Sequence, residues 1–118
     1  MSAGRLEFEV PMPPTRSEYI ERQRGKSNFT ARGRVFRRAV RQAVREQGRL
    51  TFKPVSVSIV MHQAKGPRIS LPETHAVLMS ALTSSTAFLT ERQLDHVEYM
   101  RGEDRPEGCV VVILEGAQ

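Results

Sequence analysis

Residues 30–48 have the apolar periodicity of an amphipathic helix, and this segment constrains the fold more than any other part of the chain. Thr30 is suited to the N-cap, and Gly48 to the position just beyond the C-terminal end. Between them, apolar residues recur one and four positions apart and form one stripe: Val35, Phe36, Ala39, Val40, Ala43 and Val44. We therefore expect a helix over residues 33–47 that buries this stripe against a second layer of structure.

The opposite face of this predicted helix is almost entirely cationic. Its basic residues lie three and four positions apart, so their side chains line up: Arg34, Arg37, Arg38, Arg41 and Arg45. Like charges at that spacing repel one another, and Glu46 is the only nearby residue that could relieve the repulsion. A solvated helix face usually mixes charges of both signs. We favour a phosphate-binding ridge over the alternative of an ordinary solvated face.

The chain as a whole is short and basic. It has 118 residues, with 18 Lys and Arg against 13 Asp and Glu and a net charge of +5, which predicts a single domain over residues 1–118. One arginine guanidinium can bind two phosphate oxygens at once. The net positive charge of this arginine-rich chain therefore favours a nucleic-acid partner over a role in solubility alone. The single cysteine, Cys109, excludes a disulfide framework. Residues 110–114 form the longest apolar run, which is too short for a membrane span, and residues 1–5 lack a signal-peptide core. We predict a cytoplasmic location.

The remaining apolar patterns predict an α+β fold. Strands are expected at residues 6–10, 55–62, 94–101 and 109–114. The last of these has a continuous valine run, which is typical of a strand that is buried on both faces. The resulting order, β-α-β-α-β-β, indicates a two-layer α+β domain with a mixed four-stranded sheet and two main helices.

A second helix is expected from Ser70, as its N-cap, to about residue 82. Glu73 occupies the capping-box position of this helix, and a break is expected at residues 83–86. Basic loops are expected at residues 15–29 and 63–68. Tyr19, in the first loop, is the one aromatic side chain that we would test for stacking on a base.

Few side chains are placed to carry out chemistry. The candidates near the second helix are Glu73, His75, Glu91 and Asp95. On a helix, Glu73 and His75 diverge by about 200°, so they converge only if that turn unwinds. Helix capping is the favoured role of Glu73. No spacing of Ser, His and Asp indicates a nucleophilic enzyme.

Several short motifs follow one another in a recognisable order. They are Pro11-Met12-Pro13-Pro14-Thr15 after the first strand, Thr30-Ala31-Arg32-Gly33 at the first helix, Met61-His62 at the end of the second strand, and Phe88-Leu89-Thr90-Glu91 with Gln93-Leu94 after the second helix. Together with the chain length, this arrangement resembles the RusA family of Holliday junction resolvases over nearly the whole chain.

The resemblance implies a fold, a partner and a site. Members of this family resolve four-way DNA junctions as homodimers, using Mg²⁺ and aspartates at the start of the second helix and after it, with a lysine inside that helix. The matching positions here hold Ser70, Pro72, Ala76, Thr90 and Glu91. Of these, only Glu91 has a carboxylate, and a metal held by one carboxylate binds weakly. The resemblance therefore implies the fold and the DNA partner without the nuclease chemistry.

We accordingly expect a RusA-like homodimer without a nuclease centre or a cofactor, which binds branched or duplex DNA by charge. The expected DNA contacts are Arg22, Arg24, Lys26, Arg34, Arg37, Arg38, Arg41, Arg45, Lys65 and Arg68. One alternative is an active Mg²⁺-dependent junction endonuclease with a displaced site at Glu73, Glu91 and Asp95. Another is a module that uses the same fold to bind or inhibit an unidentified protein partner.

Overall fold

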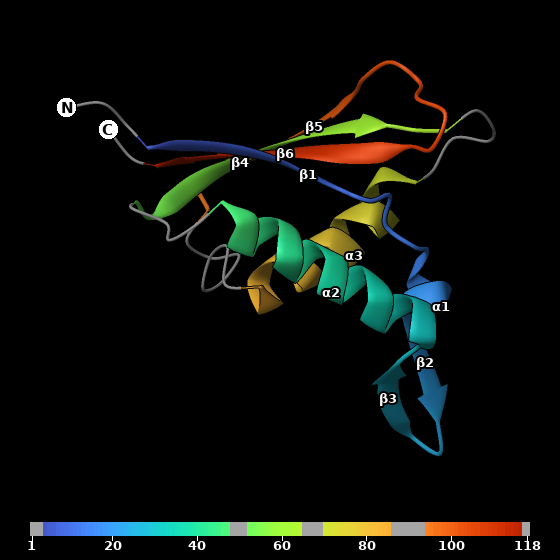
Figure 1. Ribbon diagram of the computed structural model, residues 1–118. Helices are drawn as coiled ribbons and strands as arrows, with labels where there is room; N and C mark the ends of the chain where they lie inside the picture. Colours follow the sequence, from blue (N-terminus) through green and yellow to red (C-terminus); the bar gives the residue numbers. More distant parts are fainter. Residues whose placement is uncertain (1–3, 48–51, 65–69, 86–93, 117–118) are drawn as a thin grey trace.

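The fold is a four-stranded sheet with helices packed on one of its faces (Figure 1). The computed structural model describes residues 4–47, 52–64, 70–85 and 94–116. The sheet has the order β1-β6-β4-β5 and consists of β1 (Arg5–Val10), β6 (Cys109–Gly116), β4 (Pro54–His62) and β5 (His96–Arg101). β4 and β5 are parallel, and the other neighbours are antiparallel. The predictions of an α+β fold and a mixed four-stranded sheet are confirmed.

The core lies between the sheet and two long helices, α2 (Ala31–Glu46) and α3 (Leu71–Ser84). In β6, the alternate residues Val110, Val112 and Leu114 are fully buried under the helices. Val111 and Ile113 face the other side of the sheet and are only half-buried. The prediction that this strand is buried on both faces is wrong, because helices cover only one face of the sheet (Figure 1).

Helix α2 begins where the sequence predicts. The Thr30 hydroxyl accepts a hydrogen bond from the Gly33 backbone N–H at 2.9 Å, as expected of an N-cap. Gln47 ends the helix, and the predicted role of Gly48 lies outside the described residues. Val35 was expected to be buried, yet 62% of it is exposed. It lies about 100° around the helix from Phe36, at the far edge of the apolar stripe, where the sheet no longer covers it.

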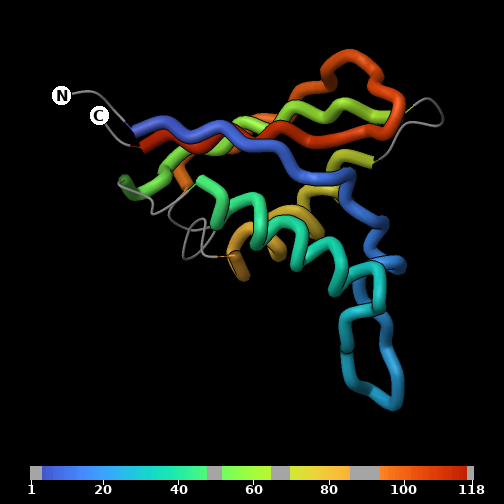
Figure 2. The backbone as a smooth tube through the Cα atoms, viewed as in Figure 1, coloured from blue at the N-terminus to red at the C-terminus, as the bar shows by residue number. Residues whose placement is uncertain are grey.

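Residues 15–29 are ordered, and the prediction of a loop over this segment is wrong. They form a short helix, α1 (Arg16–Tyr19), and a hairpin of β2 (Ile20–Gln23) and β3 (Lys26–Phe29). The two-residue turn of the hairpin has positive φ at both Arg24 (51°) and Gly25 (77°), the backbone pattern of a tight hairpin turn. The hairpin projects from the end of α2, away from the sheet (Figures 1 and 2).

Helix α3 begins after Ser70 and continues two residues into the predicted break. The Ser70 side chain makes no cap hydrogen bond; its carbonyl accepts hydrogen bonds from the backbone and hydroxyl of Thr74. Thr83 lies within the helix, and its hydroxyl donates back to the Met79 carbonyl at 2.7 Å, so it does not compete for the helical backbone hydrogen bonds of its neighbours. The helix ends at Ser84, and the rest of the predicted break is only described at Ser85. No helix in the described ranges is long and apolar enough to cross a membrane.

Candidate nucleic-acid interface

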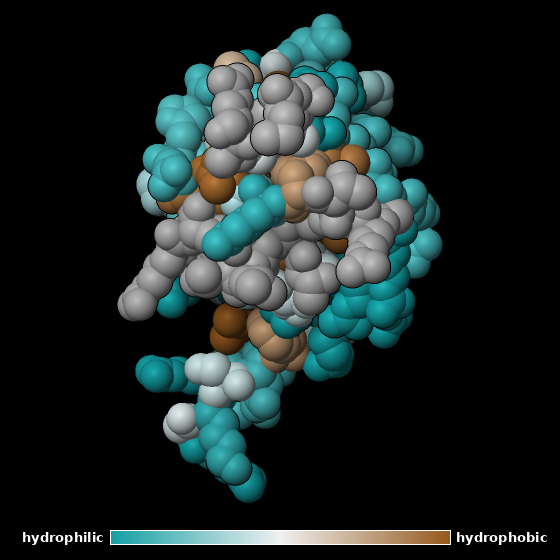
Figure 3. Space-filling model, turned by 90° about the vertical axis from the view of Figure 1, so that its left-hand side faces the viewer, coloured by the Kyte–Doolittle hydropathy of each residue, from teal (hydrophilic) through white to brown (hydrophobic). Residues whose placement is uncertain are grey.

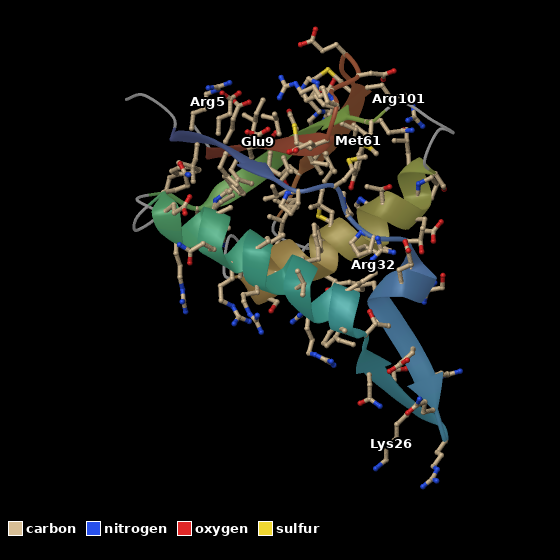
Figure 4. The ribbon with its side chains drawn as sticks, turned by 45° about the vertical axis from the view of Figure 1, so that its right-hand side comes forward. Arg5, Glu9, Lys26, Arg32, Met61 and Arg101 are labelled. Carbon is tan, nitrogen blue, oxygen red and sulfur yellow. The ribbon has the colours of Figure 1, made fainter. Side chains whose placement is uncertain are left out.

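Four exposed arginines form a straight row along the outer side of α2: Arg34, Arg38, Arg41 and Arg45. At 100° per residue, these four positions fall within about 60° of one another around the helix axis. The row spans eleven residue steps from Arg34 to Arg45, which corresponds to about 16 Å of helix. We call these four residues the arginine stripe. Figure 4 shows nitrogen-tipped side chains projecting from this side of α2, away from the sheet.

The charge of the stripe is not balanced by carboxylates on its own helix. α2 contains six arginines and one glutamate, and its net charge of +5 equals that of the whole chain. The single glutamate, Glu46, accepts a hydrogen bond from the Gln42 amide at 3.3 Å and pairs with no arginine among the described residues. The stripe is therefore a concentrated positive surface that is open to an anionic partner.

Arg37 was expected in the same ridge, but the structure places it apart from the stripe. Its guanidinium donates to the Tyr19 hydroxyl at 2.8 Å, to Ser80 Oγ at 3.3 Å and to Ser84 Oγ at 2.5 Å. It also lies over the ring of Phe29, 4.1 Å from the ring centre. Arg37 is half-buried and joins α2 to α3 and to the base of the hairpin.

The expected stacking role of Tyr19 does not agree with its position. The side chain is only 1% exposed and packs edge-on against Phe29 and Phe36. A ring that is buried in this way presents no face on which a base can stack. Tyr19 is a core residue.

The hairpin carries three further basic residues that the sequence singled out. Arg22, Arg24 and Lys26 are all exposed, and Lys26 lies near its end (Figure 4). A shallow hollow at the tip is lined by Gln23, Arg24, Lys26 and Asn28. In the space-filling view the hairpin is a narrow, hydrophilic projection from the main body (Figure 3).

The base of the hairpin is held firmly against the start of α2. The backbone N–H of Thr30 donates to the Tyr19 carbonyl at 3.0 Å, and Arg34 Nη1 donates to the Phe29 carbonyl at 2.7 Å. Gly33 lies so close that a Cβ atom there would be 2.2 Å from the Tyr19 carbonyl oxygen. The stripe and the hairpin are therefore fixed relative to each other.

Helix α1 sets the position where the hairpin begins. Its capping box pairs the Thr15 backbone N–H with Glu18 Oε1 at 3.0 Å, and the Glu18 N–H with the Thr15 hydroxyl at 3.3 Å. The bond from the Thr15 backbone N–H lowers the pKa of the Glu18 carboxyl most, and the Thr15 hydroxyl and the positive charge of Arg32 lower it further. Arg32 forms an ion pair with Glu18, so it is paired, unlike the stripe residues Arg38 and Arg41.

The candidate metal ligands have other positions and partners. Glu73 Oε1 accepts a hydrogen bond from the Arg16 backbone N–H at 2.8 Å, and so caps α1 and not its own helix. Asp95 is exposed, and its backbone N–H donates to the Val55 carbonyl beside the start of β4. Glu91, together with Lys65 and Arg68, lies outside the described residues. The described parts of the chain contain no group of three His, Cys, Asp or Glu side chains placed to hold a metal ion.

The positions that would carry the nuclease chemistry lie at the start of α3. Ser70, Pro72 and Ala76 are exposed and offer no carboxylate or amine. His75 Nδ1 is hydrogen-bonded to the Tyr99 hydroxyl at 2.6 Å, and His62 Nδ1 to the Glu103 carbonyl at 3.0 Å. These residues do not supply the hard oxygen ligands that Mg²⁺ requires.

The open face of the sheet has the opposite charge to α2. Its exposed charged side chains are Arg5, Glu7, Glu9, Glu98 and Glu115. Arg5 pairs with Glu7 at 3.6 Å, and the half-buried Arg105 pairs with Glu9 at 3.5 Å, which still leaves this face with a net negative charge. The helical side of the molecule is therefore basic, and the open side of the sheet is acidic. A polyanion is attracted to the helical side and repelled by the open side of the sheet.

No family model matches the chain, and no curated protein is significantly similar to it.

Proposed function

We propose that this protein binds duplex arms of branched DNA through phosphate contacts of the arginine stripe and does not cut the DNA. The single observation that carries the proposal is the row of four exposed arginines, with no carboxylate paired to them in the described part of the chain. Like charges at this spacing destabilise a helix unless an anion neutralises them. A phosphate backbone, with one charge per about 1.7 Å of duplex, supplies such anions in a row.

The resemblance to RusA resolvases favours a four-way junction as the form of DNA. The order of the sequence motifs and the placement of the two long helices on one face of a mixed sheet are compatible with a RusA-like fold. The absence of carboxylates at Ser70 and Pro72, and of an amine at Ala76, supports a protein that binds junctions without cleaving them. Such a protein would protect branched intermediates or block a resolvase.

A homodimer is part of this proposal. A chain of this size buries a limited fraction of its surface, so association adds to its stability. Val35 and Met100, exposed at 62% and 42%, are the two large apolar side chains left exposed in the described ranges. Sedimentation equilibrium checks the prediction: the mass expected is twice the 13.3 kDa of one chain.

The test measures binding of the protein to a labelled four-way junction and to a matched duplex at several salt concentrations. Binding is detected by the fluorescence anisotropy of the labelled DNA. Four phosphate contacts give a log–log slope of about −3.6, so affinity falls about 150-fold between about 50 and about 200 mM salt. Replacing Arg38 and Arg41 with Gln lowers the magnitude of that slope by about 1.8 and the affinity at about 0.1 M salt about 60-fold.

Arg5→Gln is the matched control, because it removes one exposed arginine from the open face of the sheet. It is expected to leave the slope unchanged. Because the control removes one charge, it is compared with Arg41→Gln alone. Equal losses of slope in Arg5→Gln and Arg41→Gln would show that only net charge matters and would refute the stripe. Absence of any binding at low salt would refute DNA binding and direct the search to a protein partner.

A second series with Mg²⁺, Mn²⁺ or EDTA tests whether the junction is cut. We expect the junction to be bound and left whole in all three. Symmetric nicking in the presence of metal would contradict the proposal and favour the alternative of an active endonuclease that uses Glu91.

A further inference from the structure

We propose that the β2–β3 hairpin enters the major groove of the bound DNA and contacts base edges. This inference rests on the proposed function and extends it from phosphate contacts to a groove. All eight residues from Glu21 to Asn28 are exposed, and only Ile20 and Phe29 at the base are half-buried. A two-stranded hairpin on its own is marginally stable, and these eight residues bury nothing in the core. The projection therefore serves no purpose in packing.

The hairpin is nevertheless built to hold its shape. Positive φ at Arg24 and Gly25 gives a turn that matches the twist of the two strands. Arg24 adopts this backbone conformation without being glycine, which costs free energy in an otherwise unconstrained loop. At the base, Phe29 packs edge-on against Tyr19, with ring centres 5.3 Å apart, and lies under the Arg37 guanidinium. This segment is thus a stiff hairpin and not a disordered loop. We call the hairpin of residues 20–29 the arm.

The side chains of the arm match the hydrogen-bonding groups that base edges present in the major groove. In the strand register, Gln23 is opposite Lys26 and Glu21 is opposite Asn28, so these four side chains share one face. Gln and Asn pair with adenine, Lys with guanine, and Glu accepts a hydrogen bond from cytosine. Arg22 lies on the other face, opposite Ser27, where it can reach a phosphate. The arm contains no exposed aromatic side chain for stacking on single-stranded bases.

The dimensions also favour the major groove. Two paired strands are about 4.8 Å apart, and with side chains they fit the major groove, which is about 12 Å wide, but not the minor groove of about 6 Å. From Ile20 to the turn, four residues of strand extend about 13 Å, which exceeds the groove depth of about 8.5 Å. The turn of the hairpin therefore reaches the edges of the DNA bases, while the end formed by Ile20 and Phe29 stays at the level of the phosphates.

The position of the arm relative to the stripe allows one duplex to contact both. Arg34, the first residue of the stripe, donates to the Phe29 carbonyl at the base of the hairpin. From this point the stripe continues along α2 toward its C-terminal end. With the hairpin in the groove, the stripe meets phosphates that flank it.

The experiment compares two duplexes of one sequence, one plain and one whose cytosines carry glucosylated hydroxymethyl groups that fill the major groove. We expect the affinity of the wild-type protein to fall at least tenfold on the filled duplex. A variant in which residues 21–28 are replaced by Asn-Gly should bind the two duplexes equally. A milder variant, with Gln23→Ala, Lys26→Ala and Asn28→Ala, should lose most of the difference. Thermal unfolding of both variants shows whether the fold is intact.

The outcomes separate this inference from the proposed function. If the wild-type protein binds the two duplexes equally and keeps a steep salt slope, the arm does not enter the major groove, while DNA binding by the stripe stands. Displacement by a minor-groove ligand such as netropsin also overturns the inference. If no duplex or junction is bound at low salt, both proposals fail.

Discussion

Replacing Arg37 with Met should destabilise the fold and leave the salt dependence of DNA binding unchanged. Methionine keeps most of the apolar stem of the side chain and removes the guanidinium. The variant therefore separates a structural role from phosphate binding at a position that the sequence assigned to the arginine ridge. The matched variant is Arg41→Met, since Arg41 lies in the stripe and is exposed, with no partner in the described part of the chain.

The contacts of Arg37 set the expected loss of stability. Two of its hydrogen bonds are short, at 2.8 Å to the Tyr19 hydroxyl and 2.5 Å to Ser84 Oγ, and the third is 3.3 Å to Ser80 Oγ. The Tyr19 and Ser80 hydroxyls lie 3.0 Å apart and remain paired with each other in the variant, so only Ser84 loses its partner. At about 1 kcal/mol for each of the two shorter hydrogen bonds, and about 0.5–1 kcal/mol for the contact of the guanidinium with the Phe29 ring, the expected loss of stability is about 2.5–3 kcal/mol.

Urea unfolding and a salt series measure the two effects separately. For a domain of this size, the expected loss lowers the melting temperature by about 10 °C, whereas Arg41→Met changes stability by less than about 0.5 kcal/mol. In DNA binding the order reverses, and Arg41→Met lowers the magnitude of the salt slope by about 0.9. The reasoning is refuted if Arg37→Met keeps its unfolding midpoint and lowers the slope by that amount.

Three further predictions concern the helices. Val40 is fully buried, so Val40→Ala should cost about 2 kcal/mol in urea unfolding, against less than about 0.5 kcal/mol for the exposed Val35→Ala. The Thr15 backbone hydrogen bond lowers the pKa of Glu18, so Glu18 contributes stability above its ordinary pKa that is lost as pH falls through the lower folded value. The unfolding midpoints of wild type and Glu18→Gln should therefore converge between about pH 6 and pH 3. Gly33→Ala should lower the melting temperature although alanine is the better helix former by about 1 kcal/mol, because its Cβ would lie 2.2 Å from a carbonyl oxygen of α1.

The long elements could be predicted from the sequence because several local signals agree at each of them. In α2, the apolar period, the Thr30 cap and the length point to one helix, and the structure has it. Strands β1 and β4 follow from alternating residues, and β6 from its continuous apolar run. The short hairpin could not be found in this way, because strands of four residues that are polar on both faces have no period. Its signals were local: Gly25 at a turn, and the capping box of Thr15 and Glu18 before it.

The candidate interface could be predicted only in outline, because charge alone does not show which arginines a fold uses internally. Arg37 lies about 100° around α2 from Phe36, beside the edge of the buried stripe, whereas the four stripe residues centre on the opposite side. Helical geometry separates the two groups, but the serines of α3 that bind Arg37 come from a segment about 45 residues away. For Glu73, the sequence predicts a capping role, but it does not show that the capped group is the Arg16 backbone N–H on α1.

The arginine stripe makes stability and DNA affinity oppose each other on one helix. Arg34 and Arg38, Arg38 and Arg41, and Arg41 and Arg45 are three like-charge pairs at helical spacing, which together cost about 1 kcal/mol. Arg41→Glu turns two of these pairs into favourable ones, so it should raise the melting temperature by a few degrees and weaken DNA binding more than Arg41→Gln does. If Arg41→Glu lowers the melting temperature and leaves DNA binding unaffected, the row contributes to stability and not to phosphate binding.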